Sequence, residues 1–105
     1  MDYVYVWEFE LNEALREQFL RSYGPDGEWV ALFRQAQGYV GTTLMSDAEH
    51  PLRFLTMDRW LSRDAQQEFA ARFRDEYTRI DRQCEAFTVR EACIGHFWVP
   101  AAAAL

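Results

Sequence analysis

The chain has 105 residues, of which 16% are aromatic, and a formal net charge of −6. This charge argues against nucleic-acid binding, because phosphate contacts need clustered cations. All 11 basic residues are arginine, which excludes a catalytic lysine, a lysine Schiff base and a P-loop. The length predicts one domain over residues 1–105, with its core in residues 3–98 and a frayed end at 100–105.

Cysteine content and hydropathy predict a soluble, cytoplasmic protein. Cys84 and Cys93 are too few for a disulfide framework, and no signal-like leader precedes Tyr3. No apolar run approaches the roughly 18 residues of a membrane span. We therefore expect no membrane contact and two reduced thiols.

The first half of the chain predicts a strand and two helices. Residues 3–9 alternate, so one face of this strand is aromatic and the other begins with Val4 and Val6. The aromatic face consists of Tyr3, Tyr5, Trp7 and Phe9. Asn12 is the expected N-cap of a first helix, which the Gly-Pro-Asp-Gly sequence at 24–27 ends. Its apolar face is formed by Leu15, Phe19 and Tyr23. A second, short helix follows with Trp29, Phe33 and Ala36 inward, and Gly38 ends it.

The second half predicts a hairpin, a long helix and a last strand. Residues 39–45 and 52–60 pair around a polar turn at 46–51 that contains His50. Ser62 is the expected N-cap of one long helix. An apolar stripe along this helix comprises Phe69, Phe73, Tyr77, Ile80 and Cys84. Residues 87–99 form the last strand, with a bend at Gly95.

The order β-α-(α)-β-β-α-β predicts an α+β, ferredoxin-like fold with a four-stranded antiparallel sheet and helices on one face. The uncovered face is expected to be apolar, which predicts a homodimer formed by two sheets back to back. The residues expected on that face are Val4, Val6, Val40, Leu44, Leu55 and Met57, or the alternate aromatic set.

Several short motifs resemble the antibiotic biosynthesis monooxygenase family, the dimeric α+β barrel proteins, over residues 3 to 98. The motifs are Val6-Trp7-Glu8-Phe9, Gly24-Pro25-Asp26-Gly27-Glu28-Trp29, Gly38-Tyr39-Val40-Gly41-Thr42, Asp58-Arg59-Trp60 and Gly95-His96-Phe97. The resemblance implies an oxygenase that uses no metal, flavin or other cofactor and acts on an aromatic, polyketide-like molecule. The alternative is a non-catalytic dimer of the same fold that binds a small molecule or serves as an accessory protein.

The resemblance also assigns residues. In quinone-forming relatives a tryptophan on the third strand lines the substrate cavity, and Trp60 matches it. Their site also has an asparagine one pleat earlier, where this chain has Thr56. Haem-degrading relatives use a histidine on a helix and an asparagine on the first strand, and this chain has neither, so haem is not implied.

Asp58 and His96 are the candidate catalytic residues, as proton acceptors for an acidic substrate hydroxyl. A carboxylate at position 58 faces the helices, where burial raises its pKa. Its alternative role is a structural ion pair with Arg79 or Arg90. The alternative for His96 is a hydrogen-bonded structural residue of the last strand.

The candidate substrate-binding residues are Trp60, Tyr77, Trp7, Phe73 and Thr56. Trp60 is expected either to stack on the substrate or to anchor the long helix in the core, and Tyr77 to orient the substrate with its hydroxyl. Arg59 should point to the dimer face and pair with Glu8 or Glu91 of the other subunit. No Cys, His and carboxylate spacing predicts a metal site.

Overall fold

In the computed structural model, which describes residues 1–100, four strands form one antiparallel sheet in the order β2-β3-β1-β4. The strands are β1 (Asp2–Leu11), β2 (Tyr39–Ser46), β3 (Arg53–Trp60) and β4 (Thr88–Val99). The helices are α1 (Arg16–Tyr23), α2 (Glu28–Phe33), α3 (Arg63–Arg72) and α4 (Arg74–Cys84), with short 3-10 turns at Glu13–Leu15 and Glu85–Phe87. Most of the segment predicted to fray, residues 101–105, lies outside the described residues.

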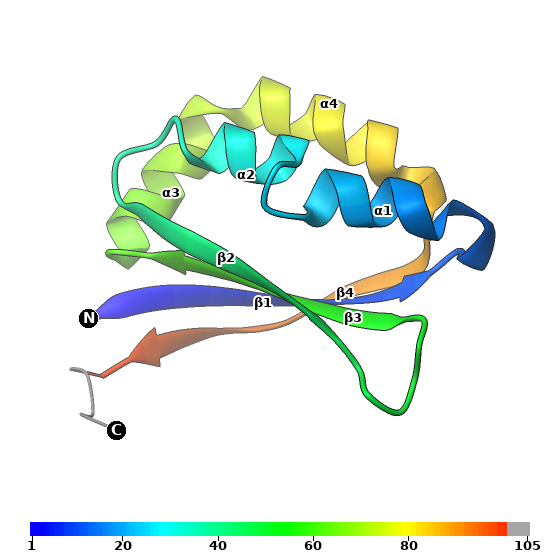
Figure 1. Ribbon diagram of the computed structural model, residues 1–105. Helices are drawn as coiled ribbons and strands as arrows, with labels where there is room; N and C mark the ends of the chain where they lie inside the picture. Colours follow the sequence, from blue (N-terminus) through cyan, green and yellow to red (C-terminus); the bar gives the residue numbers. More distant parts are fainter. Residues whose placement is uncertain (101–105) are drawn as a thin grey trace.

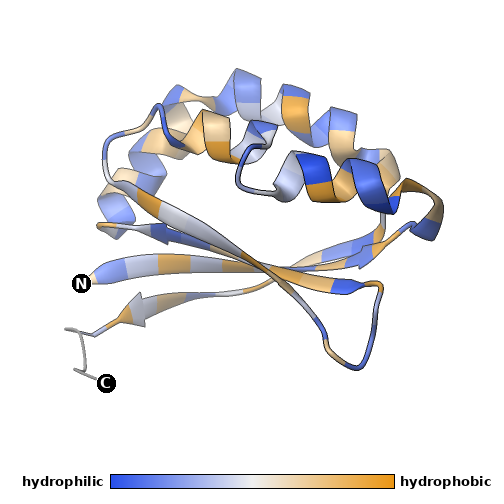
Figure 2. Ribbon diagram, viewed as in Figure 1, coloured by the Kyte–Doolittle hydropathy of each residue, from blue (hydrophilic) through white to orange (hydrophobic). Residues whose placement is uncertain are grey.

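All four helices lie on one face of the sheet, and the opposite face is uncovered (Figure 1). This arrangement and the strand order confirm the predicted α+β, ferredoxin-like fold. Hydrophobic and hydrophilic positions are interleaved along the strands (Figure 2). Within residues 1–100, no helix is both long and apolar enough to cross a membrane.

The predicted N-cap Ser62 is confirmed for α3, whereas Asn12 caps the 3-10 turn Glu13–Leu15 and not α1, whose N-cap position is Leu15. The predicted long helix is two helices. Asn12 Oδ1 accepts a hydrogen bond from the Ala14 amide at 3.2 Å, and Ser62 Oγ accepts one from Ala65 at 3.0 Å. The helical backbone is interrupted at Phe73, where φ is −107° and ψ is 24°. Arg72 in the last turn of α3 and acidic residues in the first turn of α4 suit the dipoles of two helix ends meeting here.

The apolar stripe survives this interruption. The amide of Phe73 still bonds to the Phe69 carbonyl, and the amide of Tyr77 bonds to the Phe73 carbonyl, both at 2.9 Å. The α3–α4 segment therefore keeps one face toward the sheet. Phe69, Phe73, Ile80 and Cys84 are buried in the core, and Tyr77 is half-buried beside it.

Alternation along β3 separates the two faces of the sheet. Phe54, Thr56, Asp58 and Trp60 are all buried on the helix side. Met57 and Arg59, on the other side, are exposed. The prediction that Asp58 and Trp60 share the covered face is confirmed.

A bulge in β2 corrects the predicted assignment of its faces. Tyr39 lies opposite Trp60, and Gly41 lies opposite Arg59, so Val40 is an extra residue in the ladder. Thr42 consequently lies opposite Asp58 on the helix side. Leu44, predicted for the uncovered face, packs against the core for the same reason.

A second irregularity lies in β4, next to the predicted bend at Gly95. Val6 pairs with Gly95 and Trp7 pairs with Cys93, which leaves Ile94 as the extra residue. Both bulged strands are at the edges of the sheet, where ladder irregularities are best tolerated.

The ion pairs described on the uncovered face form within one chain. Arg59 Nε donates to Asp2 Oδ2 of the same chain at 2.6 Å, and the pair with Glu8 or Glu91 of the other subunit stays a prediction. Glu8 instead accepts from Arg53 at 2.7 Å and from Arg90 at 3.0 Å. Asp2 and Glu8 lie on β1, and their arginine partners Arg59 and Arg53 lie on the neighbouring strand β3. Both pairs are therefore formed between adjacent strands of one chain.

Replacing Gly38 by alanine should destabilise the fold by about 1–3 kcal/mol, because a non-glycine residue is strained at positive φ. Gly38 has φ +88°, and an added Cβ would lie 2.7 Å from the Cβ of Ala65. Gly41→Ala is the matched control, since a Cβ there meets nothing within 4 Å. Urea unfolding of both variants checks the prediction, and equal midpoints would contradict it.

Candidate functional site

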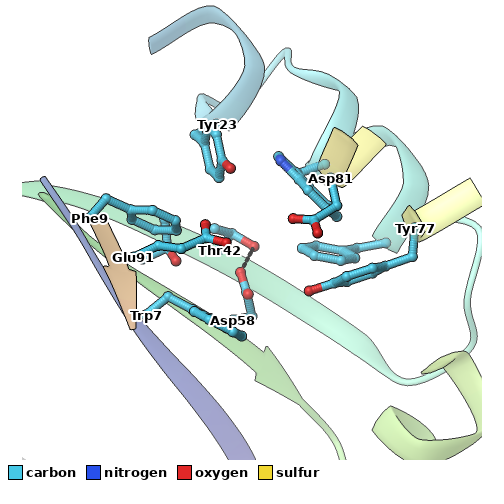
Figure 3. A pocket seen from close by; sticks show the side chains of 11 residues that line it. Trp7, Phe9, Tyr23, Thr42, Asp58, Tyr77, Asp81 and Glu91 are labelled. Atoms are coloured by element: carbon cyan, nitrogen blue, oxygen red, sulfur yellow. Dashed lines mark hydrogen bonds between the residues drawn. The ribbon is translucent and has the colours of Figure 1, made fainter. Parts of the chain in front are cut away.

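A cavity opens between the helix side of the sheet and helices α2 and α4 (Figure 3). It holds about 460 Å³ of space free of atoms, its open mouth included. The lining residues are Trp7, Phe9, Tyr23, Trp29, Phe33, Thr42, Thr56, Asp58, Tyr77, Asp81 and Glu91. Aromatic rings thus form most of the wall, while the polar side chains besides the indoles carry carboxylates or hydroxyls.

Asp58 is the most buried carboxylate of this cavity, with 9% of its surface exposed. Its Oδ1 accepts a hydrogen bond from Thr42 Oγ1 at 2.8 Å. Burial raises the pKa of Asp58 to about 6, although the Thr42 hydrogen bond acts in the opposite direction. Such a pKa suits a general base that works near neutral pH.

The ion pair considered for Asp58 is not formed. Among residues 1–100 no arginine bonds to this carboxylate, and Arg90 is engaged with Glu8 on the other side of the sheet. A carboxylate buried without a cation costs free energy. Such a cost is typical of functional sites, where a group is held ready for a ligand.

A short hydrogen-bond chain leads from β2 to Asp58. Tyr39 Oη lies 2.6 Å from Thr42 Oγ1. A threonine hydroxyl has one proton, and Thr42 donates it to Asp58, so Tyr39 must donate to Thr42. The chain fixes the Thr42 hydroxyl toward the carboxylate. Thr42 was not predicted to belong to the site, because strict alternation from Val40 assigns it to the uncovered face.

Two further carboxylates, Asp81 of α4 and Glu91 of β4, border the same cavity. Burial raises the pKa of both, and for Glu91 the negative charge of Asp81 raises it further. The hydroxyl of Tyr77 lies within the field of all three acids, since burial and then Asp81, Asp58 and Glu91 raise its pKa. Asp81 is one helical turn beyond Tyr77, a spacing that could have identified it. Glu91, predicted for the dimer face, lies on the helix side.

The aromatic wall includes a corner made by two rings. Trp29 of α2 and Tyr77 of α4 meet edge to face, with ring centroids 4.8 Å apart and an interplanar angle of 64°. The indole Nε1 of Trp29 is buried without a hydrogen-bond partner among residues 1–100. Trp29 and Phe33 were predicted to point inward, but not to line a cavity.

A second pocket adjoins the first and shares Trp7, Phe33, Asp58 and Tyr77 with it. It extends toward α3 and holds about 710 Å³ of space free of atoms, its opening included. The residues that only this pocket adds are Tyr5, Trp60, Gln66, Phe69, Ala70, Arg74 and Thr78. Asp58 therefore borders both pockets.

The structure brings most of the predicted site residues together. Trp7 and Tyr77 line both pockets, and Thr56 lines the first. Trp60 is 2% exposed and packs on Phe69 at 4.9 Å, so it is mainly a core residue that reaches the second pocket. Phe73 borders neither of these two pockets.

His96 also lies outside both pocket linings. Its Nδ1 is 2.8 Å from the hydroxyl of Tyr3, and its ring lies 4.0 Å from that of Tyr5. This is the structural, hydrogen-bonded alternative considered for it. The edge position of β4 keeps His96 exposed.

The carboxylates of the cavity do not form a metal site. Across the described part of the chain, no group of three or more His, Cys, Asp and Glu side chains is placed to hold a metal ion. Cys84 is buried in the core, and Cys93 is exposed on β4.

Several solved structures share the fold of this chain. No family model and no curated protein matches the sequence at a significant level. The chain is similar in structure to SnoaB, a cofactor-independent oxygenase from Streptomyces nogalater, with a TM-score of 0.73, 18% identity and coverage of 99% of this chain and 98% of that one. Rv0793 from Mycobacterium tuberculosis gives 0.71 at 16% identity, covering 98% and 99%.

A third similar structure is that of a protein from Nitrosomonas europaea described as an antibiotic biosynthesis monooxygenase. It gives a TM-score of 0.67 at 12% identity, with coverage of 89% of this chain and 86% of that one. At these identities the matches show a shared fold, which agrees with the α+β fold predicted from the sequence.

Asp58→Asn should stabilise the protein at pH 7.5 by about 2–3 kcal/mol, from a pKa difference of about two units at 1.36 kcal/mol each. The folded pKa of about 6 lies above the reference value of 3.8. The ionised carboxylate is therefore destabilising above pH 6, and this cost fades as the pH falls toward 4.

Thermal unfolding at pH 7.5 and pH 4 measures this effect. Tm should rise in Asp58→Asn at pH 7.5 and change little at pH 4. The exposed Asp26, in the turn between α1 and α2, supplies the control Asp26→Asn, which should behave like the unmodified protein at both values. A loss of stability in Asp58→Asn at pH 7.5 would contradict the cost assigned to the buried charge.

Proposed function

We propose that this protein is a cofactor-independent monooxygenase that acts on an electron-rich aromatic small molecule, with Asp58 as its general base. The observation that carries the proposal is a buried carboxylate without a cation, at the floor of a cavity walled by aromatic rings. Similarity of fold to a cofactor-independent oxygenase supports it, although fold alone does not determine activity.

The proposed chemistry relies on the substrate to reduce dioxygen. Asp58 removes a proton from a ring-activated CH₂ group or an acidic hydroxyl, and the resulting electron-rich anion transfers electrons to O₂. For a CH₂ group, one oxygen atom forms a new C–O bond and becomes a carbonyl. The other leaves as water with the two hydrogens of the original CH₂, so atoms and electrons balance.

The protein contributes positioning, desolvation and a proton acceptor. Aromatic walls exclude water and hold a planar ring against the base. The Tyr39–Thr42 chain orients the carboxylate from β2. Tyr77, whose hydroxyl has no hydrogen-bond partner among residues 1–100, is in place to bind a polar substituent of the substrate.

A non-catalytic ligand-binding protein is the second candidate. The lining of the first cavity contains no side-chain amide and no cationic side chain. Either group could stabilise the negative charge that develops on the substrate. This absence favours binding without turnover, and oxygen uptake separates the two functions.

Oxygen uptake with 1,8-dihydroxyanthrone tests the enzyme proposal. We expect Asp58→Asn to lower kcat by about 10²- to 10⁴-fold, the usual contribution of a general base. The exposed control Asp26→Asn should leave the rate unchanged. No uptake above the Asp58→Asn background with a panel of anthrones and dihydroxyaromatics would favour the binding protein.

The pH profile of the same reaction tests the role of Thr42. Activity should rise as the pH passes about 6, because the base must be ionised. Thr42→Val should shift this rise to higher pH, since the lost hydrogen bond lowers the pKa of Asp58 in the unmodified protein. A simple loss of activity with an unshifted profile would indicate that Thr42 acts only on packing. Asp81, Glu91 and Tyr77 also face this cavity and contribute to the profile.

We further propose a homodimer formed through the uncovered faces of two sheets. The centre of that face is apolar, with Val4, Val6, Leu55, Met57 and Phe97 on three adjoining strands. Phe97 is 48% exposed and Met57 37% exposed in one chain, which is a large apolar area to leave in water. The intrachain ion pairs of Arg59 and Arg53 lie toward the two ends of this patch.

Met57→Glu should weaken this dimer by at least about tenfold, because it places a charge in the apolar centre of the interface. Sedimentation equilibrium at micromolar concentration measures the change. Leu61→Glu is the control, since Leu61 is 60% exposed in the turn after β3. A monomeric unmodified protein that is fully folded would refute the proposed interface.

A further inference from the structure

We infer that the cavity beside Asp58 selects an organic cation, with a protonated or quaternary ammonium group on an apolar, aromatic body. This inference rests on the proposed function for the identity of the site and names its ligand class. It is carried by the aromatic walls of the cavity, by the carboxylates that face into it without cations, and by two polar groups with unused hydrogen-bonding capacity.

The charges of the lining all have one sign. Asp58, Asp81 and Glu91 come from three different elements, β3, α4 and β4, and converge on one space (Figure 3). No arginine or histidine belongs to this lining. Positive charge brought by a ligand would relieve this field, whereas an anionic ligand would be repelled.

The rings of the wall favour the same kind of ligand. Aromatic faces attract cations, and tryptophan does so most strongly. The corner between Trp29 and Tyr77 offers two such surfaces at a steep angle, with Asp81 beside them. Aromatic rings together with carboxylates form the usual surroundings of a bound ammonium group.

Two groups indicate that the cavity is built to contact a ligand. Asp58 is about nine-tenths buried, and its only hydrogen bond among residues 1–100 reaches Oδ1, which leaves Oδ2 to accept from an ammonium group. Trp29 is 7% exposed, and its Nε1 lacks an acceptor among these residues.

The carboxylates do not fit a metal ion instead, since no three of them in residues 1–100 are close enough to share one. Neighbouring space suits the apolar part of the ligand. The second pocket adds Trp60 and Phe69 to the shared rings, and the one charged group that it adds to the shared Asp58 is Arg74. A ligand that spans both pockets would place its ammonium group in the first and its aromatic body in the second.

An ammonium group would also assist the proposed reaction. Removing a proton from the substrate creates an anion beside three carboxylates, which is unfavourable for a neutral substrate. A substrate that carries its own positive charge would offset this repulsion. The cationic ligand thus supplies the charge that the lining of the first cavity lacks.

Calorimetric titration at pH 8 with three similar probes tests the inference. The probes are 2-naphthylmethylamine as the cation, 2-naphthalenemethanol as the neutral compound and 2-naphthoate as the anion. The amine should bind at least about tenfold more tightly than the alcohol, and the naphthoate more weakly than either. Equal binding of amine and alcohol, or preference for the naphthoate, would overturn the inference.

Variants assign the preference to this cavity. The double variant Asp81→Asn, Glu91→Gln should weaken the amine by about tenfold and leave the alcohol unchanged. Asp75→Asn, on the exposed side of α4, is the matched control and should change neither. Far-ultraviolet circular dichroism confirms that each variant is folded, and an unchanged preference in a folded double variant would contradict the assignment.

The outcomes also separate this inference from the proposed activity. Preferential binding of the amine without any oxygen uptake would support a cation-binding protein and refute the proposed monooxygenase activity. Oxygen uptake with neutral anthrones and no preference for the amine would support the monooxygenase activity and refute the selection of an organic cation.

Discussion

Side chains in a strand point to alternate faces of the sheet, and helices cover only one face of this sheet. Every residue of the four strands is therefore assigned either to an enclosed layer or to an open surface. On β3 the assignment buries Asp58 beneath the helices and leaves Met57 and Arg59 outside. Both the cavity and the apolar outer patch follow from this single constraint.

Two bulges modify that constraint where the site needs it. The extra residue Val40 lets Tyr39 and Thr42 lie on the same side, so their hydroxyls form a chain to Asp58. The extra residue Ile94 lets Glu91 and His96 lie on the same side of the sheet, where Glu91 borders the cavity and His96 lies outside it. A bulge costs one ladder position at the edge of a sheet, but here it determines which polar groups meet.

The cavity combines features that oppose one another energetically. Large rings exclude water, and the same exclusion makes the carboxylates costly to ionise. Thr42 offsets part of this cost for Asp58, while the charge of Asp81 raises the pKa of Glu91 beyond the effect of burial. Carboxylates buried among aromatic rings lower the stability of the fold, and such a loss is expected where the charged groups bind a ligand. The chemistry of the site is therefore best described by its uncompensated negative charge.

Local sequence determined much of this protein. Period-two and helical spacings located all four strands, the Ser62 cap and the buried stripe from Phe69 to Cys84, since these depend on neighbouring residues alone. The faces of Asp58 and Trp60 followed from the same alternation.

Tertiary structure alone decided which distant residues meet. A bulge depends on the strand beside it, so Thr42 could not be recognised from position 42. Asp58 could be predicted to be buried, but the absence of an arginine beside it depends on how β4 packs against β1, where Arg90 binds Glu8 on the opposite face.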